Sequence, residues 1–504
     1  MNVFQIFQAA AAQYPGNVAI IEKDKQITFG ALLNAVEKTA AQMKAEGLKP
    51  GDRVLVFVPM GIDLYRIVLA LFKIGATAVF LDEWVSWKRM ELCCELADCK
   101  GFVGIWKARV MGWFSKPIRQ IPIKPRIAGY AHFAADAETF PAAAEHPALI
   151  TFTTGSTGVP KAALRSHGFL RKQFEVLQEE IQPQPGGVDM TVLPIVLLIN
   201  LGAGATSVIA QFKASKPDAL KAGDIVRQIQ THGVRRITAS PFFVRKLAEH
   251  CIEHNLRLGF VEAIFTGGAP VFPVEAQTLR KAFPGAAILI AYGSTEAEPI
   301  SLVSADEVAQ ASGTEVLEAL PVGRLNRHAT VKIIPVTDGP IQWPAAQPLQ
   351  ESPPGAVGEI IVSGPHVLAA YFNNPEALRR NKIVAPDGTL WHRTGDSGFL
   401  KNGDQLFLAG RCSTLFEHHG KLICPFLYES WLQQLKGVEM GTVLSRNGAM
   451  LFCLEAQSGA DLNLIRRAIA GLNIPVFSVQ FLAKIPRDPR HHSKIDYARL
   501  LEIL

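Results

Sequence analysis

Stretches of unbroken apolar residues alternate along this chain with stretches in which apolar residues recur every three or four positions. The first pattern is typical of fully buried strands, and the second of amphipathic helices. One early unit shows both, with a strand at Arg53 to Val58, a helix at Ile62 to Ile74 and a second strand at Ala78 to Leu81. Because apolar strands joined by helices need cover on both faces, the pattern predicts an α/β fold with parallel sheets between helices.

The same alternation continues on both sides of this unit. Phe4 to Ala12 is an apolar helix, and Thr28 can cap the helix that follows it. Ser166 can likewise cap a helix, and we interpret the next residue, His167, as a structural hydrogen-bonding group and not as a catalytic one. Further strands are predicted at Ile237 to Ser240, Ala263 to Thr266, Ile288 to Ala291, Val331 to Ile334 and Gly358 to Val362, and a further helix near Leu462 to Ala470.

The segment from Met190 to Phe212 contains no charged residue and is long enough to cross a bilayer. It is interrupted by Pro194, Asn200, Gly202 and Gly204. Such interruptions leave backbone polar groups that lipid cannot satisfy. We therefore interpret the segment as a buried strand, a turn and the beginning of a helix, and we predict no transmembrane segment.

Length, charge and cysteine content narrow the class of protein. A chain of 504 residues is long for a single core, so we expect two or more domains. The formal net charge of +6 is a small excess among 51 basic and 45 acidic side chains, which argues against nucleic acid as a partner. The seven cysteines show no CxxC spacing, and Met1 to Ala12 has no basic leader before a long apolar run. Both features indicate reduced thiols in a cytoplasmic protein.

A basic segment that is rich in tryptophan lies between Glu83 and Arg126. No acidic residue follows Asp98 within it, and its tryptophans and later basic residues are Trp84, Trp87, Trp106, Trp113, Lys100, Lys107, Arg109, Lys116, Arg119, Lys124 and Arg126. Interleaved tryptophan and positive charge suit contact with an anionic membrane surface or with an acidic carrier protein. The other interpretation is an ordinary solvated face of a helix and its connecting loop.

The first segment with chemical character is Thr151 to Lys161, which reads TFTTGSTGVPK. Its backbone N–H groups and hydroxyls can surround a polyphosphate, and Lys161 adds a mobile positive charge. The residues that we assign to this role are Thr153, Thr154, Gly155, Ser156, Thr157, Gly158 and Lys161. The segment lacks the Gly-Lys-Ser/Thr ending of a Walker loop.

Two further segments of this kind follow predicted strands. Gly267, Gly268 and Ala269 have minimal side chains, which let a ligand approach the backbone, although ordinary turns use the same residues. Tyr292-Gly293-Ser294-Thr295-Glu296 combines an aromatic ring, a glycine, two hydroxyls and a carboxylate. That combination at the end of a strand suits a nucleotide and its metal ion.

These segments resemble, in the same order, motifs of the adenylate-forming superfamily, which includes acyl-CoA synthetases, peptide-synthetase adenylation domains and firefly luciferase. The later motifs of that family are matched by Thr394-Gly395-Asp396, by Gly410-Arg411 and by Lys494 near the C-terminus. Three positions depart from the family pattern. Ala162 and Ser493 stand where glycine is usual, and Ser413 stands where the hinge residue is usually aspartate or lysine.

The resemblance implies that the chain uses ATP and Mg²⁺. It places Tyr292 against adenine, Thr295 at a phosphate and Glu296 as the ligand of Mg²⁺. It places Asp396 at the ribose, where two carboxylate oxygens can accept hydrogen bonds from both hydroxyls. Arg411 would contact the ribose or a phosphate.

The same resemblance implies how the chain divides and how it reacts. Residues 1–410 would form a large N-terminal adenylating domain, and residues 411–504 a small, mobile α+β cap. Catalysis would consist of positioning and of charge neutralisation by Lys494, Lys161, Arg411 and Mg²⁺ while a carboxylate attacks the α-phosphorus of ATP. A serine–histidine–aspartate or cysteine–histidine arrangement is not needed for this reaction.

Three details indicate the substrate. The segment from Leu193 to Leu201 is apolar, as a wall for an alkyl chain would be, although core packing explains it equally well. This segment, the run YGSTEAEPI from Tyr292 to Ile300 and the ending DPRHHSKI from Asp488 to Ile495 resemble the β-lactone synthetases of bacterial olefin biosynthesis. The resemblance implies a long-chain, β-hydroxylated fatty acid that closes on itself. Two further functions stay open: a ligase that transfers a fatty acyl group to CoA or to an acyl carrier protein, and a nucleotide sensor with a decayed site.

Overall fold

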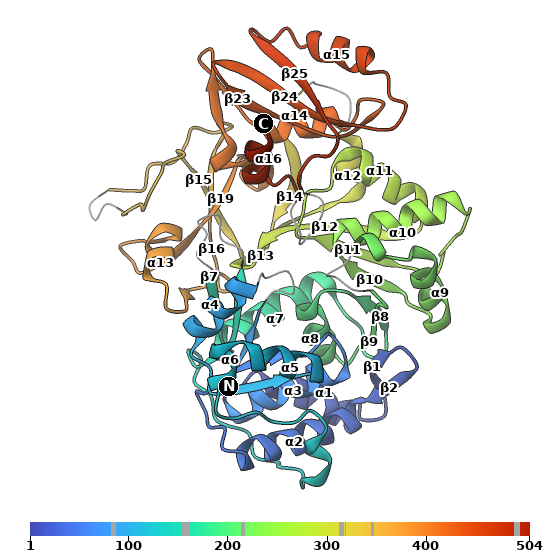
Figure 1. Ribbon diagram of the computed structural model, residues 1–504, viewed down its shortest axis with the longest axis vertical. Coiled ribbons are helices and arrows are strands. Elements are labelled where there is room, and N and C mark those ends of the chain that lie inside the picture. Colours follow the sequence, from blue (N-terminus) through green and yellow to red (C-terminus); the bar gives the residue numbers. More distant parts are fainter. Residues whose placement is uncertain are drawn as a thin grey trace.

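The computed structural model describes residues 1–81, 87–153, 161–212, 217–311, 317, 319–343, 347–487 and 494–504. Within these residues the strands form two large sheets and two small ones. In Figure 1 the N-terminal elements lie in the lower part of the molecule, and the elements that follow Arg411 lie at the top.

The smaller of the two large sheets contains the predicted β-α-β unit. Its strands, in spatial order, are β17 (Ala370–Tyr371), β7 (Lys161–Ser166), β6 (Pro147–Thr153), β4 (Thr77–Phe80), β3 (Arg53–Phe57) and β5 (Gly101–Gly104). Strands β6, β4, β3 and β5 pair in parallel. Val54 and Val56 pack into one core and Leu55 into another, so the sheet is buried on both faces, as the sequence predicted.

The larger sheet joins residues from most of the chain before Arg411. Its strands, in spatial order, are β15 (Thr330–Ile334), β16 (Gly358–Ser363), β19 (Leu390–Lys401), β20 (Gln405–Arg411), β14 (Leu320–Leu325), β13 (Ala297–Ser304), β12 (Ala287–Ser294), β11 (Ala263–Gly267), β10 (Arg236–Ala239), β8 (Val188–Thr191), β9 (Thr206–Ile209), β1 (Val18–Glu22) and β2 (Lys25–Thr28), with β18 (Lys382–Val384) beside β19. From β12 to β1 neighbouring strands are parallel. The prediction of parallel sheets is therefore confirmed for this part.

From β12 to β15 the same sheet is antiparallel. The change begins at a tight turn, because Ser294 at the end of β12 pairs with Ala297 at the start of β13. A turn of this length reverses the chain without the helix that a parallel connection needs. The antiparallel half is an addition that the hydrophobic pattern did not predict.

Helices cover both large sheets. Helices α1, α2, α3 and α8 share a core with the smaller sheet, and α9 to α12 pack in the core of the larger one. The helices are α1 (Phe4–Gln13), α2 (Phe29–Ala45), α3 (Ile62–Ile74), α4 (Trp87–Ala97), α5 (Trp106–Phe114), α6 (Lys116–Gln120), α7 (His167–Ile181), α8 (Pro194–Ala203), α9 (Ala222–His232), α10 (Pro241–Glu253), α11 (Pro273–Ala282), α12 (Ala305–Gln310), α13 (Pro375–Asn381), α14 (Pro425–Leu432), α15 (Leu462–Ala470) and α16 (Tyr497–Ile503). Short 3₁₀ helices are η1 (Gly129–His132), η2 (Pro217–Ala219) and η3 (Cys412–Thr414).

Two of these helices begin at the predicted caps. The hydroxyls of Thr28 and Ser166 each accept a hydrogen bond at 3.2 Å from the backbone N–H three residues ahead. These bonds satisfy amides that have no partner inside the helix. His167 is fully buried, and its Nδ1 accepts a hydrogen bond from the Val3 N–H at 3.1 Å. Burial lowers the pKa of His167 to about 4, so the ring is neutral and acts as the structural group that the sequence predicted.

The apolar segment from Met190 to Phe212 is folded into the protein. It contains the end of β8, all of α8 and all of β9, so a second strand follows the predicted strand and helix. Leu197 and Leu201 of α8 are fully buried. Among the helices that the structure describes, none combines the length and the apolar character that crossing a membrane requires.

The chain after Arg411 forms sheets of its own. Strand β21 (Phe416–His418) pairs with β22 (Lys421–Ile423), and β23 (Val438–Arg446), β24 (Ala449–Ala456) and β25 (Phe477–Leu482) form a three-stranded sheet. Residues of α14, α15 and this sheet share a core that includes Phe452 and Ile465. Phe426 of α14 packs on the preceding part of the chain, with its ring 5.2 Å from that of Phe272. The division into a domain of residues 1–410 and a mobile cap of residues 411–504 stays a prediction.

Candidate active site

One large cavity lies where the carboxyl ends of strands from both large sheets meet, and its volume is about 1920 Å³. It is lined by Lys161, Gly267, Gly268, Ala269, Tyr292, Gly293, Ser294, Thr295, Glu296, Asp396, Arg411 and Lys494. Thr153 is the last residue of β6, and Thr154, Gly155, Ser156, Thr157 and Gly158 lie outside the described residues. The fold thus brings together the sequence-predicted site residues from Lys161 to Lys494.

Three glycines in the cavity wall are required by the backbone. A Cβ on Gly267 would lie 2.7 Å from the carbonyl oxygen of Ala291, and a Cβ on Gly293 would lie 2.7 Å from that of Ala297. Gly268 has a φ of +85°, which residues with a side chain rarely adopt. Close packing of β11, β12 and β13 therefore explains Gly267 and Gly293, the backbone conformation explains Gly268, and all three line the cavity.

Tyr292, Asp396 and Arg411 form a polar cluster that joins three strands. The Tyr292 hydroxyl donates to Asp396 Oδ2 at 2.9 Å, and Arg411 Nη1 lies 3.0 Å from Asp396 Oδ1. Asp396 and Arg411 face each other in the register of β19 and β20. The Asp396 carboxylate raises the pKa of Arg411, and burial together with Asp396 raises the pKa of Tyr292. Each oxygen of the Asp396 carboxylate has a further lone pair with which it can accept a hydroxyl of a ligand.

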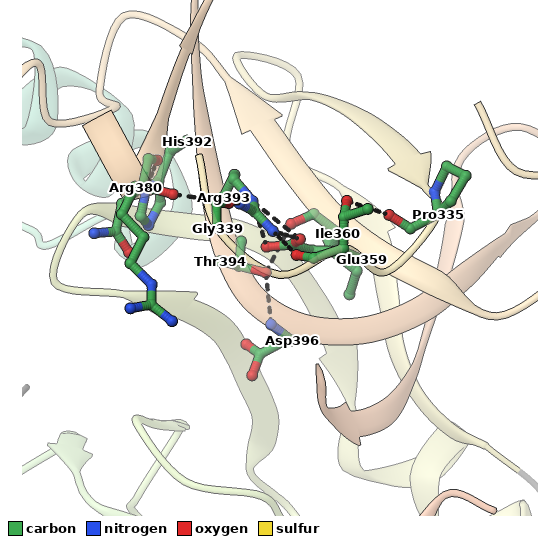
Figure 2. A network of polar contacts seen from close by, with 11 residues as sticks. Pro335, Gly339, Glu359, Ile360, Arg380, His392, Arg393, Thr394 and Asp396 are labelled. Carbon is green, nitrogen blue, oxygen red and sulfur yellow. Dashed lines mark hydrogen bonds and ion pairs between the residues drawn. The ribbon is translucent and has the colours of Figure 1, made fainter. Parts of the chain in front are cut away.

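A buried ion pair fixes the strand that carries Asp396. Figure 2 shows Arg393 directed at Glu359, and the distance from Arg393 Nη2 to Glu359 Oε2 is 2.5 Å. The guanidinium also donates to three backbone carbonyls, those of Thr337, Gly339 and Arg380. Next along the strand, the Thr394 hydroxyl donates to the carbonyl of Ile360 at 2.8 Å and accepts the N–H of Asp396 at 3.0 Å. These contacts connect several separate segments to β19 beside Asp396.

We expect Arg393→Met to destabilise the chain strongly. The side chains of Arg393 and Glu359 are 9% and 3% exposed, so the substitution leaves a buried carboxylate without its partner. Removal of one member of a buried pair costs about 3–5 kcal/mol. Arg324→Met is the matched control, because Arg324 and Asp404 are 70% and 46% exposed, and an exposed pair contributes about 0–1 kcal/mol. Urea unfolding measures both losses, and equal losses would contradict the role of the buried pair.

Glu296 occupies the turn between β12 and β13. Its N–H donates to Ser294 Oγ at 3.2 Å, and Arg165 of β7 donates to the carbonyl of Thr295 at 3.3 Å. The Tyr371 hydroxyl donates to Glu296 Oε1 at 3.1 Å. Both the turn and the side chain are therefore held in place. A carboxylate held at a cavity wall is a suitable oxygen ligand for a hard cation such as Mg²⁺.

Two lysines from different strands lie near Glu296. Lys161 Nζ donates to Asn381 Oδ1 at 3.2 Å. Lys382 is 5% exposed, and its Nζ has no hydrogen-bond partner among the residues that the structure describes. Burial lowers the pKa of both lysines, that of Lys382 to about 7, while Glu296 opposes the shift. Burial alone would raise the pKa of Glu296, but His392, the two lysines and the Tyr371 hydroxyl together bring it below its ordinary value.

We expect the unchanged chain to gain stability over the Lys382→Met variant as the pH rises from about 8 to about 10. In this range the unfolded chain binds more protons than the folded one, so a rise in pH favours the folded state. The reason is that the pKa of this lysine falls from its ordinary value of 10.5 to about 7 on folding. Rising pH then favours the folded state by up to about 1.4 kcal/mol per pH unit, and the methionine variant lacks this contribution. Urea unfolding of both proteins at the two ends of the range measures the effect. A constant difference in stability would contradict the low pKa of the lysine.

The C-terminal part of the chain also contributes to the cavity. Lys494 lines it together with Tyr497, whose hydroxyl lies 2.7 Å from that of Thr442. Ser413 of η3 lines it as well. The arrangement thus adds a cation from the end of the chain to the lining of the cavity that Glu296 and Arg411 also line.

Helix α8 contributes apolar residues to both the cavity and the core. Leu193, just before the helix, lines the cavity with Ile195 and Leu198. Leu197 and Leu201 pack in the core that α8 shares with the smaller sheet. Ile195 and Leu198 also pack against that core, so these residues serve both the core and the apolar surface of the cavity.

Four side chains of the site are missing from the sequence prediction: Arg165, Glu359, Tyr371 and Lys382. Arg165 lies four residues after Lys161 on β7, and alternate residues of a strand share one face of the sheet. The sequence could therefore have indicated that Arg165 lies on the same face as Lys161. Tyr371 and Lys382 lie on short strands that reach the site only by pairing with β7 and β19. No local pattern in the sequence indicates those pairings.

Comparisons with known proteins agree with this geometry. A family model described as AMP-binding enzyme matches residues 7–372. The olefin β-lactone synthetase of Stenotrophomonas maltophilia is 30% identical, over 92% of this chain and 88% of its own length. The olefin β-lactone synthetase of Xanthomonas campestris is 27% identical, over 95% of this chain and 90% of its own length. The structure of O-succinylbenzoate coenzyme A synthetase from Bacillus subtilis in complex with ATP and magnesium ion shares the fold, with a TM-score of 0.80 at 22% identity over 98% of this chain and 99% of that one.

Proposed function

We propose that this chain, which belongs to the AMP-binding enzyme family, converts a long-chain β-hydroxy fatty acid to a β-lactone. The chain is an ATP-dependent, AMP-forming ligase that activates carboxylic acids. The observation that carries the proposal is the lining of one cavity, where the apolar side of α8 is combined with Lys161, Glu296 and Lys494. The similarity to two olefin β-lactone synthetases over 92% and 95% of the chain supports the lactone as the product.

The polar end of the cavity fits ATP and Mg²⁺. We assign Tyr292 to the adenine and Asp396 to the ribose hydroxyls, with the loop from Thr153 to Gly158 at the phosphates. Gly267, Gly268 and Gly293 leave bare backbone in the cavity wall, so the base or a phosphate of ATP can approach the chain closely. Glu296 would hold Mg²⁺, which when bound neutralises phosphate charge and assists the departure of pyrophosphate.

In the first step a carboxylate oxygen of the fatty acid attacks the α-phosphorus of ATP, and the bond from that phosphorus to pyrophosphate breaks. The carboxylate and the α-phosphate both carry negative charge and repel each other as they approach, and further negative charge builds on the departing pyrophosphate. We assign Lys494, Lys161 and Arg411 to neutralise this charge, a role in which fixed cations are effective because no reorganisation is needed. The ion pair with Asp396 holds Arg411 in the required orientation.

In the second step the β-hydroxyl oxygen attacks the acyl carbon of the adenylate. The bond from that carbon to the AMP oxygen breaks, and the hydroxyl proton passes to water. Since the hydroxyl and the acyl group belong to one molecule, this attack has the advantage of an intramolecular reaction. CoA would have to compete from solution. Ser413 supports this assignment, because the hinge residue usual in the superfamily is absent from its position.

A fatty acyl-CoA or acyl-carrier-protein ligase is the second candidate function. The fold that this chain shares with a coenzyme A synthetase supports it. The two candidates share the adenylation step and differ in the group that attacks the acyl carbon. They are therefore distinguished by the product and not by the activation of the acid.

Incubation of the purified chain with ATP, Mg²⁺ and matched long-chain acids, with and without a β-hydroxyl, tests the proposal. ATP–pyrophosphate exchange reports adenylation, and mass spectrometry identifies the products. We expect the hydroxy acid to give a product lighter by one water without CoA, and the plain acid to stay bound as its adenylate. Rapid CoA-dependent conversion of the plain acid to a thioester, with no lactone from the hydroxy acid, would establish the ligase instead.

A further inference from the structure

Helix α5 presents its large apolar side chains to solvent. Trp106, Val110, Trp113 and Phe114 follow helical spacing and are 69%, 49%, 75% and 79% exposed. We name these four residues the α5 stripe. Its two tryptophans and its phenylalanine are the most exposed large apolar side chains among the described residues. A contiguous exposed patch of this kind marks an interaction surface.

The opposite side of α5 is firmly packed. Ala108 and Gly112 are buried, and a Cβ on Gly112 would lie 2.8 Å from Ile118 Cγ2. The Arg109 guanidinium donates to three backbone carbonyls, those of Gly104, Lys124 and Pro125. The orientation of the helix is therefore fixed, and the exposure of the α5 stripe does not result from loose packing.

Basic residues accompany the α5 stripe along the chain, and Lys107 Nζ lies 5.6 Å from the centre of the Trp106 ring. Lys107, Lys116, Arg119 and Arg126 are exposed, and the sequence has no acidic residue between Asp98 and Asp136. In Figure 1, α4, α5 and α6 lie together in the lower part of the molecule. Exposed aromatic residues with basic neighbours are the chemistry that binds an anionic lipid surface. An acidic carrier protein could use the same charges and rings, but the apolar cavity lining that the same helix contributes favours a lipid surface.

The same helix borders the cavity. Lys107, Ala108 and Met111 of α5 line it, together with Phe57 at the end of β3 and Leu81 just after β4. An apolar part of the cavity therefore begins beside the α5 stripe. We propose that α5 seats the protein on the surface of an anionic bilayer, so that a long-chain acid enters the cavity beside this helix. The identity of that acid rests on the proposed function, whereas the docking surface does not.

Flotation of the full chain with vesicles tests this proposal. We expect the chain to float with phosphatidylglycerol vesicles more than with phosphatidylcholine vesicles. Binding should weaken with salt, because the screening length falls from about 10 Å at 0.1 M to about 3 Å at 1 M. The combined variant Trp106→Ser, Trp113→Ser and Phe114→Ser should bind at least about tenfold more weakly, since it removes the apolar contact. The combined variant Lys116→Glu and Arg119→Glu should lose the preference for anionic vesicles.

A matched control is the combined variant Leu462→Ser and Leu464→Ser, which removes exposed apolar side chains from α15. It should bind vesicles as the unchanged chain does. Failure of the unchanged chain to float would overturn the proposal. Equal binding by the triple variant of Trp106, Trp113 and Phe114 would also overturn it. Capture of an acidic acyl carrier protein without vesicle binding would do the same and would assign the surface to the carrier.

Adenylation of a water-soluble, short-chain acid separates docking from catalysis. The triple variant of Trp106, Trp113 and Phe114 should lose flotation but retain this activity and the circular dichroism spectrum of the folded chain. That result would support docking as a function separate from catalysis. Flotation of the unchanged chain without any adenylation would support the docking surface and would refute the proposed function.

Discussion

Lys494→Ala is expected to slow adenylation by about a hundredfold or more, the effect of removing one preorganised charge donor. Lys494 lines the same cavity as Glu296 and Arg411. The other two cations are less able to replace it, because Lys161 donates to Asn381 and Arg411 pairs with Asp396. ATP–pyrophosphate exchange with a saturating fatty acid measures the change.

Lys484→Ala is the matched control for this experiment. Lys484 is an exposed lysine in the same C-terminal part of the chain, so its loss tests the effect of one positive charge outside the cavity. The control should exchange pyrophosphate at the rate of the unchanged chain. Exchange in Lys494→Ala at that same rate would remove Lys494 from the mechanism.

Glu296→Gln is expected to weaken the apparent affinity for Mg²⁺ by about tenfold to a hundredfold, as changes around a metal ion typically do. The glutamine keeps the shape of the side chain and can still accept the hydrogen bond from Tyr371, but it lacks the negative charge. Exchange measured over a series of Mg²⁺ concentrations reports the change as a shift of the midpoint. An unshifted midpoint would show that Glu296 is not the ligand.

Tyr371→Phe separates charge from orientation in this test. It removes the hydrogen bond to Glu296 and retains the carboxylate, so we expect a smaller shift in the Mg²⁺ response. Glu296→Gln also leaves Lys382, a buried lysine, without its neighbouring negative charge. The free energy of unfolding should therefore be measured for both variants, so that a loss of activity is not confused with a loss of fold.

Features that depend on short segments could be predicted from the sequence. The segment from Tyr292 to Glu296 carries its ring, hydroxyls and carboxylate within one turn of chain, and it lies in the cavity wall. The caps at Thr28 and Ser166 also depend on residues only three positions apart, and both are present. Such local chemistry does not require knowledge of the rest of the fold.

Features that depend on distant pairing could not be predicted. Arg393 and Glu359 are 34 residues apart, and the pairing of β16 with β19 brings them together. Tyr371 reaches Glu296 only because β17 adds to the edge of β7. The tryptophans of the basic segment are evident in the sequence, but which of their neighbours are exposed depends on how Ala108 and Gly112 pack.

The measurement that tests the central claim most directly follows oxygen through the reaction. A long-chain β-hydroxy acid with heavy oxygen in both carboxylate positions is incubated with the chain, ATP and Mg²⁺, without CoA, and the products are weighed by mass spectrometry. If the carboxylate attacks the α-phosphorus and the hydroxyl then displaces AMP, the AMP gains one heavy oxygen and the lactone retains the other. Unlabelled AMP, or ADP with the label in inorganic phosphate, would contradict this account.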